Sequence, residues 1–502
     1  MNTMSPPSPD GGEARVGRTA LVLVPIALAS RGAAFLVPLV IAMWFGVGDI
    51  TDAWYWALAF PTFALVLAST ALGTAATPAM ARVRAEAPER LPAFLGGLLV
   101  WTAIGSALAG ALICVAAPWA LPSVTAFPPE TRALAAGFLW ELLPFMVLTS
   151  AGAVLRVACE VHGRFTVVAV TPLVRATTVI ATTWALLGPI GAHALPWGLV
   201  AGEVVQGLWW AAWLLATGVR IRPSLRLDPA VAQVGRDLAP ILGGEVLVAL
   251  NLVVDKAFAG MLPSGSVATL EYADRARVIP QTLLESTLVM VAYATWSNLR
   301  AAGRTGEARR AVDQALRWTL ALAAPPVAGM FIGRMVLVGL LYERGAFTAA
   351  DTAATASVLA WYLPGVLPNL LGILAVRAHV VERNLRLVLV LGVTSLTANA
   401  VFNTLLFRPM GLEGLALATT LNMALVPGLY LWFLRDRIDS RAREWAAALG
   451  VVAAAAAVAL VVEFGPGPPR SLLEPSLWIA AVACFGLLGL AWRVTRAPAE
   501  VG

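Results

Sequence analysis

The chain has 502 residues, of which 59% are hydrophobic and 13% are charged, and its formal net charge is +6. Its mean hydropathy of +0.80 excludes an ordinary soluble enzyme and indicates a protein that crosses a bilayer many times. The excess of basic residues would suit a nucleic-acid-binding protein, but membrane proteins also gather basic residues on one side of the bilayer. The positions of the arginines along the chain distinguish the two. The three cysteines and three histidines are scattered without ligand spacing, so we expect no metal site built from them and no nucleic-acid partner.

About 20 apolar residues cross the hydrocarbon, and dividing the chain at charged or Pro/Gly-rich breaks gives about fourteen such spans. The sequence therefore predicts an all-α integral membrane protein. The approximate limits of the spans are 19–46, 52–80, 91–117, 134–158, 164–187, 195–217, 238–262, 271–299, 315–341, 352–379, 384–407, 412–434, 443–463 and 473–493.

The arginines predict the orientation of these spans. The polar stretch 1–18 has no small-residue cleavage site after a short apolar core, so we expect a cytoplasmic tail before a retained helix. With the N-terminus inside, most of the 35 basic residues fall in cytoplasmic segments. The opposite connections hold only Arg132, Arg344, Arg408 and Arg470. This bias predicts an even number of spans, with both termini cytoplasmic.

The longest inner connection, GVRIRPSLRLDPAVAQVGRD, divides the spans into two blocks. Its apolar residues alternate with Arg, which favours an amphipathic segment on the inner membrane surface. We expect a lobe of six helices at 19–217, the linker at 218–237, a second six-helix lobe at 238–434, and two additional helices with a tail at 435–502. Two such lobes around a central cavity are typical of transporters that bind substrate near the bilayer midplane.

Arg31 lies close to the middle of the first span, where neither end of the helix is within easy reach. Either a structural ion pair or an anionic ligand in a cavity would satisfy it, and we favour the ligand. Asp52 opens the second span near the outer face, where a carboxylate suits the helix dipole and acts more often as a cap than as a functional group.

The hairpin 251–285 carries more charge than membrane helices usually tolerate. Asp274, Arg275 and Arg277 lie near the start of its second helix, where a salt-bridged cap is the ordinary reading. The two arginines point in different directions, so one internal partner cannot serve both. We expect at least one to face a cavity, where Arg suits a pyrophosphate because its planar fork stays charged when desolvated.

Asp255 and Lys256 are adjacent and diverge on a helix, so the carboxylate needs a proton, a cation or a distant Arg. Asn399 and Asn403 share one helical face, and Thr419 follows in the next span. Interhelical hydrogen bonding is the ordinary role of such residues, and an all-oxygen site for a small cation is the alternative. The carboxylates of Glu141, Glu203 and Glu245 leave proton relay and structural pairing equally open. No nucleotide-binding, nucleophile-elbow or zinc-hydrolase motif is present, which predicts a non-enzyme driven by an ion gradient or the membrane potential.

Four segments resemble the MurJ/MviN family of lipid II flippases, which belong to the multidrug/oligosaccharidyl-lipid/polysaccharide exporter superfamily. They are SRGAAF…FGVGDITDAWYWALAFPTF, VVDKAFAGMLPSGSVATLEYADRARVIP, LYERGAFTAADTAATASVLAWYLPGVLPN and NAVFNTLLFRPMGLEGLALATTLN. The resemblance implies a fourteen-helix fold in the bacterial inner membrane. It also implies alternating-access movement of undecaprenyl-pyrophosphate-linked peptidoglycan precursor to the outer leaflet, with membrane lipids and cell-wall synthesis proteins as partners.

The resemblance implies that Ser30, Arg31, Asp52 and Arg275 line the central cavity. Asp255, Asn399, Asn403 and Thr419 match positions that resemble a sodium site in some members, although Asn403 stands where a carboxylate is expected. The chain departs from the family pattern at Val37 and in FALVLAS, where arginines are usual, at Val278, where an acidic residue is usual, and in VVERNLRLVLV. With fewer cavity cations, Arg277 is a candidate substitute, and another lipid-linked saccharide stays open as the substrate. A non-transporting membrane scaffold, in which the charges are purely structural, is the other alternative.

Overall fold

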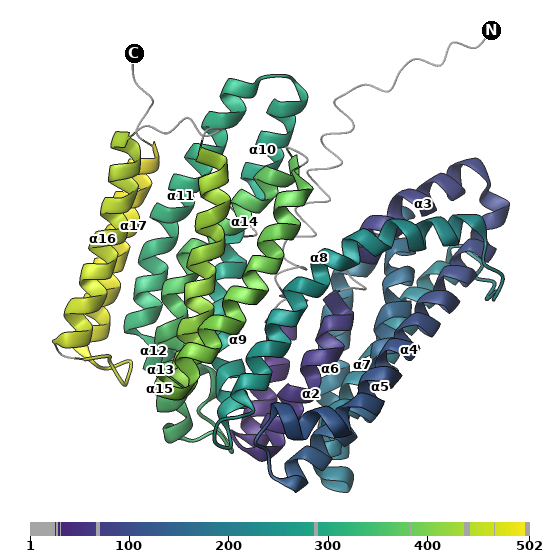
Figure 1. Cartoon of the computed structure of the whole chain (residues 1–502), viewed down its shortest axis with the longest axis horizontal. Helices are drawn as coiled ribbons and strands as arrows, with labels where there is room; N and C mark the ends of the chain where they lie inside the picture. The colour runs from purple at the N-terminus through teal and green to yellow at the C-terminus, as the bar shows by residue number, and fades with distance from the viewer. Residues whose placement is uncertain are drawn as a thin grey trace. The chain divides into compact units, whose positions relative to one another are not determined.

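The computed structural model describes residues 26, 29–30, 32–66, 71–285, 290–381, 384–435, 442–465 and 467–496. Over these ranges the chain forms helices and connecting turns without a strand, which confirms the all-α prediction (Figure 1). It divides into two compact units. Unit 1 comprises Met1–Ile41, Trp56–Ser123 and Pro128–Val246, and unit 2 comprises Ala42–Tyr55, Val124–Phe127 and Leu247–Gly502. The predicted division into lobes at 19–217 and 238–434 stays a prediction.

The helices of unit 1 follow one another along the chain. They are most of α2 (Asp49–Val66), then α3 (Leu72–Glu86), η2 (Pro88–Arg90), α4 (Leu91–Val124), α5 (Pro129–Val161), α6 (Phe165–Ile190), η3 (Gly191–His193), α7 (Ala194–Ala216) and the first part of α8 (Pro229–Ala259).

The remaining helices belong to unit 2. After the second part of α8 come α9 (Ser266–Leu284), α10 (Met290–Ala301), α11 (Thr305–Ile332), α12 (Arg334–Tyr342), α13 (Ala349–Tyr362), η5 (Leu363–Gly365), α14 (Val366–Val381), α15 (Leu385–Leu434), α16 (Ala442–Phe464) and α17 (Pro475–Arg496).

Seven helical stretches in the described part of the chain are long and apolar enough to cross a membrane. Two of them, Phe165–Ala216 and Arg386–Leu434, have 52 and 49 residues, more than twice the roughly 20 residues that one crossing needs. Each stretch is therefore long enough for two of the predicted spans. Each is also interrupted by a glycine with positive φ, Gly191 at 58° and Gly411 at 60°. The total of fourteen spans stays a prediction.

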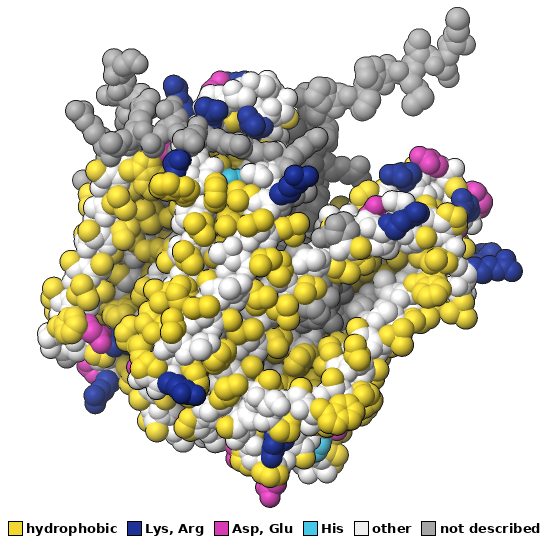
Figure 2. Space-filling model, in the orientation of Figure 1, with side chains coloured by type: hydrophobic (Ala, Val, Ile, Leu, Met, Phe, Trp, Pro, Cys, Tyr) yellow, Lys and Arg dark blue, Asp and Glu magenta, His cyan; other side chains and the backbone are white. Residues whose placement is uncertain are grey.

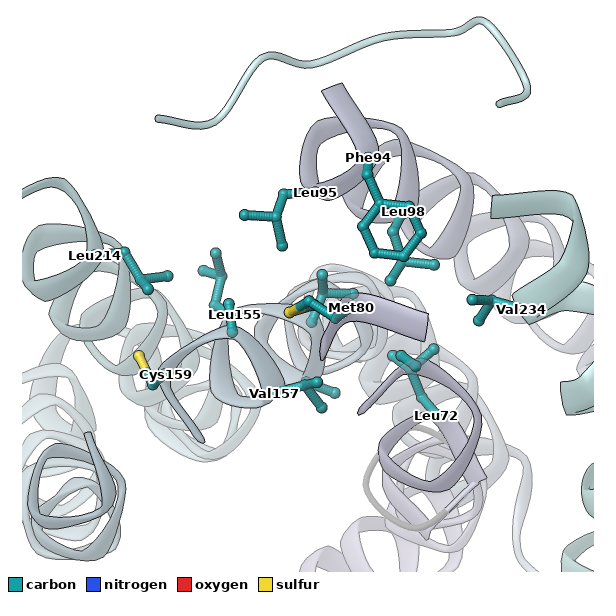
Figure 3. Close-up of a cluster of buried hydrophobic side chains, with 14 of the residues drawn as sticks. Leu72, Met80, Phe94, Leu95, Leu98, Leu155, Val157, Cys159, Leu214 and Val234 are labelled. Carbon is teal, nitrogen blue, oxygen red and sulfur yellow. The ribbon is translucent and has the colours of Figure 1, made fainter. Parts of the chain in front are cut away.

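Unit 1 has a buried apolar cluster contributed by α3, α4, α5, α6, α7 and α8, which includes Leu72, Met80, Phe94, Leu155 and Leu214 (Figure 3). Within lipid, apolar burial adds little to helix association, so close backbone approach matters more. Gly198 and Gly202 provide it where α7 meets α6. A Cβ at these positions would lie 2.0 Å from the Thr183 Oγ1 and 2.6 Å from the Val179 Cγ2.

Two carboxylates left open by the sequence are paired within unit 1. The Arg175 Nε lies 2.6 Å from the Glu203 Oε1, and the Glu203 side chain is almost fully buried. The His193 Nδ1 lies 2.8 Å from the Glu141 Oε1. Both arrangements agree with structural pairing.

In unit 2, α16 and α17 pack against α11. The Trp445 indole donates to the Asp313 Oδ1 at 2.7 Å, and the Arg334 Nη2 donates to the Glu463 Oε1 at 2.7 Å. These two polar contacts join α16 to α11 and to α12.

Candidate functional site

The hairpin formed by the end of α8 and by α9 is held through its turn. The Asp52 carboxylate accepts hydrogen bonds from the Gly265 and Ala268 amides, at 2.6 and 2.8 Å. The Ser264 hydroxyl donates to the Asp49 Oδ1 at 2.7 Å. Asp52 is fully buried and satisfies the amides at the start of α9, where a negative charge also suits the helix dipole. Asp52 therefore caps a helix, although not the helix that contains it.

The cations of the hairpin are paired with carboxylates of the same hairpin. Glu271 accepts from the Lys256 Nζ at 2.5 Å through Oε2 and contacts the Arg275 Nη2 at 2.7 Å through Oε1. Arg277 has a different partner, because its Nε and Nη2 donate to the Asp274 Oδ1 at 2.9 and 2.6 Å. The expectation that one internal partner cannot serve both arginines is confirmed.

A cavity of about 560 Å³ opens beside the hairpin within unit 2, walled by α8, α9, α14 and α15. Its volume lies in the range of small-molecule sites. The charged residues of its lining are Asp255, Lys256, Glu271, Asp274, Arg277 and Arg377. Lys256 and Arg277 are paired as described, and the Arg377 Nη2 lies 3.5 Å from the Glu285 Oε1. Each of the four helices contributes polar or charged side chains to the lining, and Arg277 is a cation at the wall.

Asp255 differs from the other carboxylates because amides contact it instead of a cation. The Asn399 and Asn403 side-chain amides both donate to the Asp255 Oδ1, at 2.8 and 2.7 Å. The carbonyl oxygens of these two asparagines are buried and have no hydrogen-bond partner, and the same is true of Asn251 and Asn422. Buried oxygens without donors are uncommon in folded proteins. Asn251, Asn399 and Asn422 line the same cavity as Asp255, and carboxylate and amide oxygens are ligands suited to a small hard cation.

The other predicted site residues lie in several places. Arg31 falls outside the described residues. Ser30 is buried in unit 1, where its hydroxyl donates to the Ala169 carbonyl at 2.6 Å. Arg275 is not part of the cavity lining, whereas Arg277 and Thr419 are. The substrate-binding and coupling roles assigned from the sequence stay predictions.

Several residues of the lining had not been predicted from the sequence, among them Tyr362, Asn369 and Arg377. Asn369 and Arg377 lie on α14, and the Tyr362 ring lies 5.6 Å from the Arg277 guanidinium carbon. Arg377 falls near the end of the predicted span 352–379, and it lies within α14. A helical projection of residues 366–381 would have placed Asn369 and Arg377, eight residues apart, on one face.

Comparison with known proteins decides the family. The sequence profile described as "Lipid II flippase MurJ" matches residues 41–465. The chain belongs to the MurJ family. A "Probable lipid II flippase MurJ" of Vibrio cholerae is 25% identical over 437 residues, which cover 83% of this chain and 83% of that protein.

The fold of this chain is similar to those of solved structures. "Lipid II flippase MurJ, inward closed conformation" superimposes with a TM-score of 0.80 at 19% identity, covering 94% of this chain and 98% of that one. An inward-facing multidrug resistance MATE transporter of the MOP superfamily gives a TM-score of 0.64 at 15% identity, covering 80% and 98%. Membership of the MurJ family confirms the resemblance noted in the sequence. It identifies a multi-pass bacterial inner-membrane transporter and not an enzyme.

Proposed function

We propose that this protein moves lipid II, the undecaprenyl-pyrophosphate-linked peptidoglycan precursor, from the inner to the outer leaflet by alternating access. The observation that carries the proposal is the family match over residues 41–465. The name of the Vibrio cholerae relative points to the same substrate. In this proposal both termini are cytoplasmic, and cell-wall synthesis proteins consume the product at the outer face.

Arginines would hold the anionic head group. Arg275 is suited to this role because Glu271 keeps Lys256 as a partner when Arg275 turns away. The Arg275 Nε is buried without a hydrogen-bond partner, and a third of the side chain is exposed. Arg277 adds a second guanidinium at the cavity wall, and Arg31 with Ser30 adds a contact from the first helix. Guanidinium groups suit phosphates because they donate two parallel hydrogen bonds.

A sodium ion or a proton would couple transport to a gradient. The oxygens of Asp255, Asn399, Asn403 and Thr419 would hold sodium, and the four unpartnered asparagine carbonyls support this fit. Bound sodium would neutralise the Asp255 carboxylate, and protonation would do the same. Asp255 itself positions the two asparagine amides through its Oδ1, so a change in its charge reaches α15 directly.

Replacement of the resident lipid II flippase tests this function. Cells depleted of that flippase lyse unless another protein exports the precursor, so we expect the wild-type chain to restore growth. We expect Arg31→Ala and Arg275→Ala to be inserted at normal levels without restoring growth. Failure of the well-inserted wild-type chain would overturn the proposed function, and rescue by both variants would overturn the roles of Arg31 and Arg275.

A specific observation favours a second candidate, a flippase for another lipid-linked oligosaccharide. Val37 and the FALVLAS segment lack arginines that are usual in the family, which leaves fewer cations for a pyrophosphate. The same depletion experiment separates the two functions, because a repeat-unit flippase would restore export of its own polysaccharide without restoring growth.

A further inference from the structure

A second cavity, a groove of about 710 Å³, opens within unit 1 between α4, α5 and the first part of α8. Its walls are mainly apolar and include Leu72, Leu98, Trp101, Ile113, Met146 and Leu242. Leu72 and Leu98 come from different helices of the buried cluster, beside Val234 of α8 (Figure 3). The hydroxyls of Thr102 and Ser106 donate to carbonyls of their own helix, at 2.7 and 2.9 Å. The groove therefore offers a hydrocarbon surface.

The inner linker fixes one end of this groove. The Arg222 amide donates to the Pro92 carbonyl at 2.9 Å. A Cβ at Gly96 would lie 1.8 Å from the Arg222 carbonyl oxygen, so only glycine permits this approach. At the start of α8, the Arg90 Nη2 contacts the Asp228 Oδ2 at 2.8 Å.

Asp228 also caps α8, because its Oδ1 accepts from the Ala230 amide at 2.8 Å. Partial burial raises the pKa of this carboxyl, but the Ala230 amide and the Arg90 guanidinium outweigh that effect and hold the pKa below its usual range. Asp228 therefore stays charged at neutral pH. Hydrogen bonds and an ion pair therefore hold the linker in place at this end of the groove.

Positive charge lies beside the groove, on α8 and on the linker. Arg236 lines the groove and is exposed, and it has no ion-pair partner in the described chain. Arg220, Arg222 and Arg226 are exposed on the linker. Basic side chains are visible at this end of unit 1, over α3 and the neighbouring connection (Figure 2). Leu225 and Leu227 are 72% and 57% exposed beside them, and Leu227 continues the apolar wall of the groove.

The surroundings of the groove are those of a lipid-facing surface. Leu108 and Leu112 of α4 are 68% and 71% exposed, as expected for side chains that contact acyl chains. An apolar groove that opens on such a surface and ends at free arginines matches a molecule with a hydrocarbon tail and an anionic head. The cytoplasmic leaflet supplies such molecules, and arginines near its surface attract them.

We propose that this groove binds an anionic glycerophospholipid of the inner leaflet, with an acyl chain against Trp101 and Met146 and the phosphate at Arg236 and the linker arginines. The bound lipid joins α4, α5 and the start of α8. This site is independent of the transported substrate, because it lies within unit 1 and uses none of the residues assigned to the head group of lipid II.

The test uses the full-length protein in a neutral detergent, with dioleoyl-phosphatidylglycerol as the probe and dioleoyl-phosphatidylcholine as the uncharged comparison. Native mass spectrometry measures the affinity for each lipid, and thermal unfolding measures the stabilisation. We expect the wild-type protein to retain phosphatidylglycerol in preference to phosphatidylcholine. A charge-assisted hydrogen bond contributes enough that Arg236→Gln lowers the affinity for phosphatidylglycerol about tenfold.

Filling the groove provides a second variant. Gly105 lines the groove, and a Cβ there meets no atom within 4 Å, so Gly105→Phe places a ring in the groove and is expected to abolish the preference. Gly207→Phe is the matched control, because its Cβ also meets no atom within 4 Å and lies on α7 outside the groove; it should bind as the wild type does. Equal retention of both lipids by the wild type, or undiminished phosphatidylglycerol binding by both variants, would overturn the proposal. Binding of a polyprenyl phosphate in place of phosphatidylglycerol would also overturn it, by identifying the groove with the substrate tail.

Discussion

Lys256 and Glu271 form an ion pair across the α8–α9 hairpin, with 2.5 Å between the lysine Nζ and the glutamate Oε2. The lysine side chain is only 4% exposed, and the glutamate side chain is 14% exposed. The other glutamate oxygen holds Arg275. One carboxylate therefore balances two cations, which explains how a membrane hairpin tolerates so much charge.

Removing the charge of Glu271 should destabilise unit 2 strongly. Glu271→Gln leaves the buried Lys256 without a counter-charge, and breaking a buried pair in this way costs about 3–5 kcal/mol. Arg275→Ala is the matched control, because Glu271 keeps Lys256 and the loss should be much smaller. Thermal unfolding of both purified variants measures the difference. Equal unfolding temperatures would contradict this account of the hairpin.

Removal of the Asp52 carboxylate should loosen the start of α9. Asp52→Ala leaves the Gly265 and Ala268 amides unpaired in a buried place, at a cost of about 1–3 kcal/mol. Asp49→Ala removes only a contact with Ser264 at an exposed position and should change stability little. The comparison is made by thermal unfolding, and a cap role for Asp52 is refuted when the two variants unfold alike.

The turn before α2 requires glycine at position 46. Gly46 has φ 61°, and a Cβ there would lie 2.4 Å from the Ala346 carbonyl oxygen. The Gly46 carbonyl also accepts from the buried Tyr272 hydroxyl at 3.2 Å. Gly163 has φ 71° but open space for a Cβ, so Gly163→Ala should cost only about 1–2 kcal/mol for the left-handed backbone. In thermal unfolding, Gly46→Ala should unfold at a clearly lower temperature than Gly163→Ala. The reverse order would contradict the requirement for glycine at position 46.

Asp255 should control the binding of the coupling ion. If sodium occupies the oxygen cluster, sodium raises the unfolding temperature of the wild type relative to choline, and Asp255→Asn abolishes that rise. Asp351→Asn serves as the control, because Asp351 is a partly exposed carboxylate that caps α13. Absence of a sodium effect on the wild type would leave protonation of Asp255 as the coupling event and refute the sodium site.

The sequence was sufficient for the fold class because apolar run length and arginine placement act locally along the chain. It also indicated that Asp255 and Lys256 must have separate partners, since neighbouring helical side chains diverge. It could not show that Asp52 caps α9 instead of its own helix, because the contact joins residues 213 and 216 positions apart. Nor could it show that Glu271 serves both Lys256 and Arg275, because that depends on the rotation of α8 against α9.

The most direct test of the proposed function measures lipid II at the outer surface of cells whose only lipid II flippase is this chain. An externally added hydrolase that cuts lipid II reports the exposed fraction, with radiolabelled precursor as the readout. We expect the wild-type chain to restore cleavage, and Arg275→Ala to leave lipid II protected despite normal insertion. Protected lipid II in cells carrying the well-inserted wild-type chain would contradict the account.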